Sequence, residues 1–215
     1  MLRKRTGDEI EICDSAGRTF LAKLRAESDG VSASLESELG ATRPPAIDIV
    51  LAQGVPKGAK MDFVVEKATE LGVGRIVPFV SERTQGSGAE RAGKVERWRR
   101  VARAAAQQCG RADVPAVDAP LDWTELCALM GGFDRALVPW ELAPRQALRE
   151  VLPALLAGAR SVLIAIGPEG GLSHAEVERA VAAGATPVSL GSRILRTETA
   201  GLVACSAILY ESGDL

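Results

Sequence analysis

The stretch Ile166-Gly167-Pro168-Glu169-Gly170-Gly171-Leu172-Ser173 decides the fold, because it joins a short apolar run to the start of a helix. Residues 161–166 have the apolar pattern of a strand that is buried on both faces. Ser173 and Glu176 have capping-box spacing, which predicts a helix over 173–183. A glycine-rich turn after such a strand lets a ligand lie against the backbone, at the edge where open α/β sheets bind ligands. Taken alone, the glycine-rich turn is also compatible with a simple strand-to-helix connection that binds no ligand.

A second turn of the same kind is Leu190-Gly191-Ser192-Arg193-Ile194-Leu195-Arg196-Thr197-Glu198-Thr199-Ala200. Thr197 is the expected N-cap of the next helix, and Glu198 complements the helix dipole. Arg196 is a cation placed where an anion is preferred. Two interpretations stay open at this point: a surface arginine paired with Glu198 or Glu169, or a cation held near a pocket for an anionic ligand.

Outward from these turns, strands and helices alternate. The predicted strands are 47–51, 75–80, 134–138, 161–166 and 186–190, and the predicted helices are 60–71, 92–109, 145–156, 173–183 and 198–210. This alternation indicates an α/β fold with a parallel sheet covered on both faces. Ahead of it, alternating polar and apolar residues predict short strands at 9–13, 19–24 and 31–35, followed by a linker over 38–45.

Composition limits the function. The 215 residues include 26 basic and 28 acidic ones, so the formal net charge is −2, and nucleic acid must be contacted by a local basic patch. The cysteines and the single histidine, His174, lack the paired spacing of a zinc site, so no metal is expected. The start of the chain lacks the apolar stretch of a signal peptide, and no run is long enough to span a membrane. We therefore expect a cytoplasmic protein without a membrane partner.

The two turns also carry a resemblance. GPEGG followed by LGSRILRTETA resembles the SPOUT methyltransferase superfamily, and more closely the bacterial 16S rRNA uridine-N3 methyltransferases. Further blocks of that family pattern occur in order along the chain. They are Lys57-Gly58-Ala59-Lys60-Met61-Asp62, Lys67-Ala68-Thr69-Glu70-Leu71-Gly72-Val73, Ser81-Glu82-Arg83-Thr84 and Ala106-Gln107-Gln108-Cys109-Gly110-Arg111.

The resemblance implies a parallel sheet with a carboxyl-terminal trefoil knot that binds S-adenosylmethionine (SAM), and a homodimer that contacts 16S rRNA of the small ribosomal subunit. The loop 139–141 is expected to complete the cofactor pocket. By motif match, the cofactor-binding residues are Gly167, Pro168, Glu169, Gly170, Gly171, Leu190, Gly191, Ile194, Leu195, Thr197 and Ala200.

The resemblance also implies two domains: a small PUA-like β-barrel that binds RNA over 1–43, and the SPOUT methyltransferase domain over 44–215. Family members carry further residues ahead of the segment that matches Arg5–Asp8. The barrel is therefore expected to be incomplete at its amino-terminal end, and an unclosed barrel leaves exposed strand edges.

The implied chemistry is methyl transfer from a sulfonium to uridine N3. The sulfonium is already electrophilic, so alignment of the reacting atoms supplies much of the acceleration. N3 carries a proton, which must be removed, and a nearby cation stabilises the resulting anion. The candidate cations are Arg196, Arg83 and Arg111, and Glu169 or Glu198 is expected to accept the proton or to orient an arginine.

The densest basic run lies in the predicted helix 92–109. Between residues 91 and 103 there are six basic residues and one acidic residue. Two interpretations remain: a phosphate-binding patch for RNA, or a solvated helix face opposite a buried Trp98. The residues predicted to bind RNA are Arg97, Arg99, Arg100, Arg103 and Arg111, with Arg91 and Lys94 at the start of the run.

Two other functions remain open on the sequence. One is a SPOUT enzyme that methylates the ribose 2′-oxygen or acts on another RNA. The other is a non-catalytic RNA-binding factor in ribosome assembly.

Overall fold

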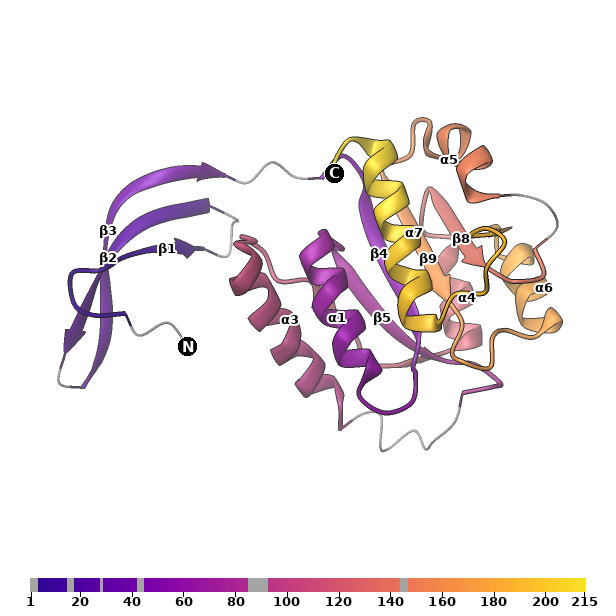
Figure 1. Ribbon diagram of the computed structural model, residues 1–215, viewed down its shortest axis with the longest axis horizontal. Helices are drawn as coiled ribbons and strands as arrows, with labels where there is room; N and C mark the ends of the chain where they lie inside the picture. Colours follow the sequence, from indigo (N-terminus) through magenta and orange to yellow (C-terminus); the bar gives the residue numbers. More distant parts are fainter. Residues whose placement is uncertain (1–3, 15–17, 28, 42–44, 85–92, 144–146) are drawn as a thin grey trace. The chain divides into compact units, whose positions relative to one another are not determined.

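The structure is a computed structural model that describes residues 4–14, 18–27, 29–41, 45–84, 93–143 and 147–215. The chain divides into two compact units (Figure 1). The first contains the amino-terminal sheet and Gly110–Asp113, and the second contains Pro45–Cys109 and Val114–Leu215. The domain boundary expected between residues 43 and 44 lies outside the described residues.

The first unit is an antiparallel sheet with strand order β1-β2-β3. Its strands are β1 (Glu9–Cys13), β2 (Arg18–Glu27) and β3 (Gly30–Ala41). The three predicted strands are confirmed, but the linker predicted from residue 38 is wrong as far as Ala41, which pairs with Arg18. A bulge next to Gly40, whose φ of +107° favours glycine, lets β3 keep pairing there.

The second unit is built on a parallel sheet with strand order β10-β8-β9-β4-β5-β6, and β7 pairs with β5. The strands are β4 (Asp48–Gly54), β5 (Arg75–Val80), β6 (Ala116–Val117), β7 (Leu121–Asp122), β8 (Arg135–Pro139), β9 (Ser161–Ile166) and β10 (Ala185–Val188).

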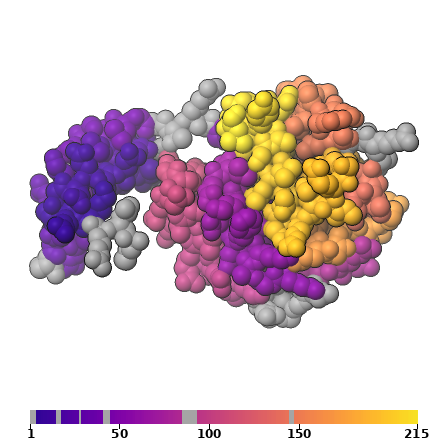
Figure 2. Space-filling view, in the orientation of Figure 1, coloured from indigo at the N-terminus to yellow at the C-terminus, as the bar shows by residue number. Residues whose placement is uncertain are grey.

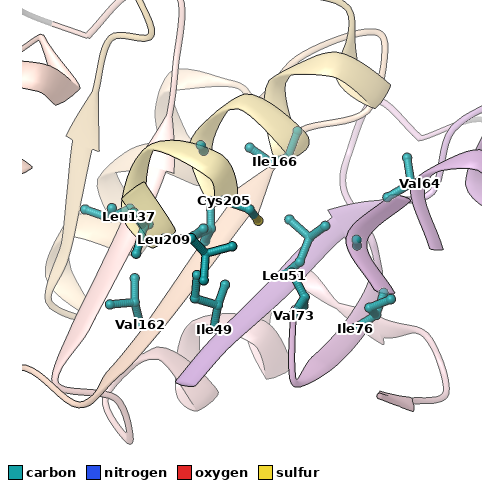
Figure 3. Close-up of a cluster of buried hydrophobic side chains, with 14 of the residues drawn as sticks. Ile49, Leu51, Val64, Val73, Ile76, Leu137, Val162, Ile166, Cys205 and Leu209 are labelled. Atoms are coloured by element: carbon teal, nitrogen blue, oxygen red, sulfur yellow. The ribbon is translucent and has the colours of Figure 1, made fainter. Parts of the chain in front are cut away.

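Helices cover both faces of this sheet, as the sequence predicts (Figure 1). On one face lie α1 (Lys60–Leu71), α3 (Val95–Cys109), α5 (Leu148–Leu156) and α7 (Thr197–Ser212), and on the other lie α4 (Trp123–Met130) and α6 (His174–Ala182). Strand alternation creates the two layers. Ile49 and Leu51 of β4 pack beneath α1 and α7 (Figure 3), whereas Val50 and Ala52 face α4 and α6.

Most predicted boundaries fall within a few residues of the structure. The predicted first residues of two helices, Ala92 and Arg145, lie outside the described residues. Cys109 is exposed rather than on the apolar face of α3, because the buried face of the helix ends at Ala106. β10 ends at Val188, so Leu190 belongs to the following loop and not to the predicted strand.

Helix α4 was not predicted from the sequence. The Asp122 side chain accepts a hydrogen bond from the backbone N–H of Glu125, and the Glu125 carboxylate accepts one from the backbone N–H of Asp122, which forms a capping box. The Asp-x-x-Glu spacing at 122–125 is the signal that could have located the helix.

The fold positions the loops that follow β4, β8, β9 and β10. Because these strands are adjacent and parallel, their carboxyl ends meet at one edge of the sheet. Both turns that the sequence analysis singled out leave this edge. Among the described residues, no helix is long and apolar enough to cross a membrane.

Candidate active site

Two adjoining pockets lie at the carboxyl edge of the sheet. The larger has a volume of about 420 Å³ and is bounded by the loop after β8, the turn after β9, the segment 194–200 and Lys60. The smaller, of about 150 Å³, is bounded by 189–195 and shares Pro139, Trp140 and Glu141 with the larger. Every residue predicted to bind the cofactor lines one of the two pockets, and the loop 139–141 lines both, as expected.

Glycines shape the turn after β9 because neighbouring backbone comes very close. A Cβ on Gly54, at the end of β4, would lie 2.6 Å from the backbone nitrogen of Pro168. A Cβ on Gly170 would lie 2.9 Å from Cβ of Arg83, and Gly171 has a φ of +68°. Side chains at these positions would displace the turn, so the pocket wall is largely backbone.

Thr197 is not the N-cap of α7, contrary to the prediction. Arg196 occupies the N-cap position, and its side chain makes no capping hydrogen bond. The Thr197 hydroxyl instead points into the protein, where it donates to the Gly167 carbonyl at 2.6 Å and accepts from Nε2 of Gln53 at 2.8 Å. Thr197 is 6% exposed, and this hydrogen-bonded link joins β4, the turn after β9 and α7.

Thr197→Val is therefore expected to lower the free energy of unfolding by about 1–3 kcal/mol, because the Gln53 amide and the Gly167 carbonyl lose a buried partner. Urea denaturation measures the change. Thr199→Val is the matched control, since Thr199 is exposed on the same helix. Equal stability of the two variants would show that the buried hydroxyl does not hold these segments together.

An ion cluster borders the larger pocket. Nζ of Lys60 lies 3.1 Å from Oε1 of Glu169 and 3.4 Å from Oε2 of Glu198. Partial burial raises the pKa of the Glu169 carboxyl, but the N–H groups of Glu169 and Lys57 and the Lys60 ammonium outweigh it, so this pKa lies below its ordinary value. The hydrogen bond to Glu169 raises the pKa of Lys60. Glu169 is thus a stable carboxylate and a weak base.

Arg196 fits both interpretations that the sequence left open. Its Nη1 lies 4.0 Å from Oε1 of Glu198, and its side chain is 81% exposed where it lines the larger pocket. Arg83 is placed differently: its Nη1 donates to the Gly170 carbonyl at 2.9 Å, so it supports the glycine-rich turn from outside. The structure thus places four of the five catalytic candidates, Arg196, Glu198, Glu169 and Arg83, in or against the turn after β9 and the start of α7.

The remaining arginine candidate for catalysis, Arg111, lines neither pocket. It follows α3 and donates two hydrogen bonds, each of 2.8 Å, to the Asp113 carboxylate. These bonds lower the pKa of Asp113. Arg111 therefore lies outside the pocket formed by this chain.

Four of the arginines predicted to bind RNA, Arg97, Arg99, Arg100 and Arg103, are exposed along α3, opposite Trp98, which is 2% exposed as expected for a core residue. The fifth, Arg111, follows the helix, and its side chain is only 13% exposed. Arg97 forms an ion pair with Asp62 of α1, and Arg99 pairs with Glu96 and donates to the Val117 carbonyl. We call the residues Lys94, Arg97, Arg99, Arg100 and Arg103 the α3 basic patch. Arg91 of the predicted run lies outside the described residues.

Several residues that line or support the pockets were missed, or were left without an individual role, by sequence reasoning. Gly54 and Gln53 act through the close packing of β4 against distant loops, which no local pattern reveals. Trp140 lines both pockets, donates from Nε1 to the Leu172 carbonyl at 3.3 Å and packs edge-on against His174. Lys60 lies in a block quoted for the resemblance, which indicated its importance but not its contacts.

This architecture defines the class of protein. The ends of adjacent parallel strands enclose a pocket that is lined by glycines, with cations and carboxylates nearby. This arrangement in an open α/β sheet is typical of an enzyme that binds an organic cofactor or substrate. The chain belongs to the family of RNA methyltransferase domains, whose family model matches residues 43–209.

Relatives of known name and structure agree with this membership. Ribosomal RNA small subunit methyltransferase E of Bacillus subtilis is 36% identical over 219 residues, an alignment that covers 99% of this chain and 85% of the relative. The crystal structure of the Neisseria gonorrhoeae enzyme of the same name, bound to SAM, has a TM-score of 0.83 and 30% identity, and covers 97% of this chain and 85% of that one. A Legionella pneumophila structure in complex with SAM matches with the same TM-score and identity, and covers 97% and 85%.

Proposed function

We propose that this chain transfers a methyl group from SAM to N3 of a uridine in 16S rRNA of the small ribosomal subunit. It is a SAM-dependent rRNA methyltransferase, in agreement with the names of its relatives and with the SAM-bound structures similar to it. The observation that carries the proposal is the pocket, because residues predicted from two separate turns line it together.

The pocket suits SAM in size and chemistry. Its larger part, of about 420 Å³, falls within the range of pockets that bind small organic ligands. The glycines after β9 expose backbone to which an adenosine can hydrogen-bond, and a side chain at Gly171 would meet the pocket residue Glu141. Glu141 and Glu169 supply carboxylates for a cationic ligand. We assign SAM binding to the predicted residues of both turns, together with the loop 139–141.

Catalysis needs a stabilised uracil anion next to the sulfonium methyl, which SAM supplies as the electrophile. We assign the stabilising cation to Arg196, since it is exposed on the pocket wall, and the orientation of Arg196 to Glu198. Glu169 is a poor proton acceptor because its pKa is lowered. Arg83 positions the turn through Gly170. Arg111 remains assigned to RNA contact.

The finer fold belongs to the same proposal. We infer that the segment 189–215 passes through the loops after β8 and β9 as a trefoil knot, which is supported by the meeting of these segments around one pocket. We also infer a homodimer. Ile194 is 87% exposed on the pocket wall, and Val203 and Tyr210 extend an exposed stripe along α7, whose segment lies at the surface in Figure 2.

The amino-terminal sheet is assigned to RNA docking as a PUA-like domain over 1–43, with the methyltransferase domain over 44–215. Its support is the antiparallel order β1-β2-β3 and its separation as a compact unit. RNA contact by the second unit is assigned to the α3 basic patch.

The double variant Arg100→Ala/Arg103→Ala is expected to weaken rRNA binding about tenfold. It is also expected to reduce the slope of log K against log salt by about one to two, because fewer phosphate contacts form and fewer counterions are released on binding. Fluorescence anisotropy over a salt series measures both quantities. Arg179→Ala on α6, across the sheet, is the control. An unchanged slope would place the phosphate contacts elsewhere.

Nucleoside mass spectrometry of rRNA tests the proposed function. Small-subunit rRNA from a deletion strain is expected to lack one 3-methyluridine, which the wild-type gene restores. Loss of a 2′-O-methyl nucleoside would identify a ribose methyltransferase instead. Unchanged methylation with impaired subunit assembly would identify a non-catalytic assembly factor.

A further inference from the structure

Lys60 stands at a position that local helix chemistry disfavours. It is the first residue of α1 and follows Ala59, whose side chain makes no cap hydrogen bond. The amino end of a helix carries partial positive charge, which disfavours a cation there. The reason for a lysine at this position must therefore lie in its tertiary contacts.

Those contacts join segments that are far apart in the sequence. The Lys60 ammonium donates to Oε1 of Glu169 at 3.1 Å, in the turn after β9, and lies 3.4 Å from Oε2 of Glu198, in the first turn of α7. The backbone N–H of Lys57 also donates to the same Glu169 oxygen, at 3.0 Å. The segment 57–60 thus donates two hydrogen bonds to the turn after β9, from the Lys57 N–H and the Lys60 ammonium. The ammonium also contacts the first turn of α7.

The two carboxylates belong to different segments that border the larger pocket. Glu169 lines the pocket in the segment 166–172, whereas Glu198 directly follows the lining residues Arg196 and Thr197 without lining the pocket itself. Oε2 of Glu198 is buried and makes no hydrogen bond in the described part of the chain, so the Lys60 ammonium is its nearby compensating charge there. Without that cation, Oε2 of Glu198 would lose the ammonium beside it, and the exposed Arg196, 4.0 Å from the other carboxylate oxygen, would remain as a cation near Glu198.

Global stability does not account for this cluster. The Lys60 side chain is 37% exposed, and ion pairs at such exposure contribute little to the free energy of folding. An interaction of small energy between two pocket walls nevertheless fixes their spacing, and ligand binding depends strongly on that spacing.

We propose that Lys60 is a positioning residue that sets the distance between the two pocket walls by bridging Glu169 and Glu198. It thereby holds the cofactor pocket in its binding geometry and aligns the start of α7, which carries Arg196. This inference rests on the proposed function, because the wall spacing matters for SAM.

Lys60→Met tests the bridge, and Lys67→Met is its matched control. Lys67 lies on the same helix and also contacts two carboxylates, Glu66 and Glu70, both at 2.8 Å, but these belong to its own helix and line neither pocket. Calorimetry is expected to show a SAM dissociation constant about tenfold higher for Lys60→Met, as for loss of one charge-assisted contact, and within about twofold of wild type for Lys67→Met.

A double-mutant cycle separates positioning from a merely structural effect. If Lys60 acts through Glu169, the losses of SAM affinity in Lys60→Met and Glu169→Gln are not additive in the double variant. Lys60→Arg is expected to recover most of the affinity, since it keeps the cation. Thermal unfolding of all variants shows whether each one is folded.

The outcomes are distinct. Wild-type affinity in Lys60→Met, equal losses in the two lysine variants, or additive losses in the cycle would each overturn the bridge while leaving the proposed function intact. Absence of SAM binding by the wild-type chain would instead contradict the proposed function itself.

Discussion

Gly54→Ala is expected to weaken SAM binding by about a hundredfold or more. The added Cβ would lie 2.6 Å from the backbone nitrogen of Pro168 and 2.9 Å from the carbonyl carbon of Gly167. Both partners are backbone atoms at the root of the glycine-rich turn, so no side-chain rotation relieves the overlap. The turn must move away from β4, and a displacement of about 1 Å in a binding wall is enough for a hundredfold loss.

The same substitution is expected to cost about 1–3 kcal/mol of stability, because overpacking a filled interior forces backbone shifts. Calorimetry with SAM and urea denaturation measure the two effects. Gly131→Ala is the control, since Gly131 has a helical φ of −66° and open space around its Cβ position. Wild-type SAM affinity in a folded Gly54→Ala chain would disprove the assignment of this turn to the pocket.

Arg196→Ala is expected to lower turnover by about 10²–10³-fold, the usual effect of removing one preorganised group that stabilises developing charge. SAM affinity is expected to stay within about twofold of wild type, because the Arg196 side chain is 81% exposed and its ion pair with Glu198, at 4.0 Å, is long. In the proposed reaction, loss of the cation raises the pKa of uridine N3, so part of the activity is expected to return at higher pH.

Single-turnover methylation of rRNA at saturating SAM measures this effect separately from binding. Arg149→Ala is a matched control, because the Arg149 side chain is 85% exposed, pairs with Glu150 and lies on α5, where it lines neither pocket. If turnover falls only in proportion to SAM affinity, Arg196 serves binding and another group must stabilise the anion.

The sequence predicted the parallel α/β fold and both turns because their signals are local. Apolar runs such as 161–166, the glycine after α1 and the Ser173–Glu176 capping box each fix a boundary without knowledge of the rest. Gly72, with a φ of +98°, ends α1 where it was predicted to end. The prediction that the cofactor residues of the two turns lie together came from the family resemblance. The order of the strands in the sheet could not be predicted from any of these local patterns.

What local patterns could not reveal depends on contacts between distant segments. Thr197 resembles an N-cap in sequence, but Gln53, 144 residues away, and the Gly167 carbonyl draw its hydroxyl into the protein. In sequence, Gly54 is an ordinary residue at the end of a strand. Only the structure shows that Pro168 packs against it. The role of Arg196 was ambiguous in the sequence, because it depends on whether the side chain lies at the pocket, and local patterns do not locate the pocket. The roles given to the catalytic and RNA-binding residues remain predictions.

A calorimetric titration of SAM into the wild-type chain tests the central claim most directly, namely that the two turns form one SAM-binding pocket. The account predicts saturable binding of one SAM per chain, which Gly54→Ala weakens by about a hundredfold or more and Gly131→Ala leaves intact. No binding by a chain that circular dichroism shows to be folded, or equal binding by Gly54→Ala, would contradict it.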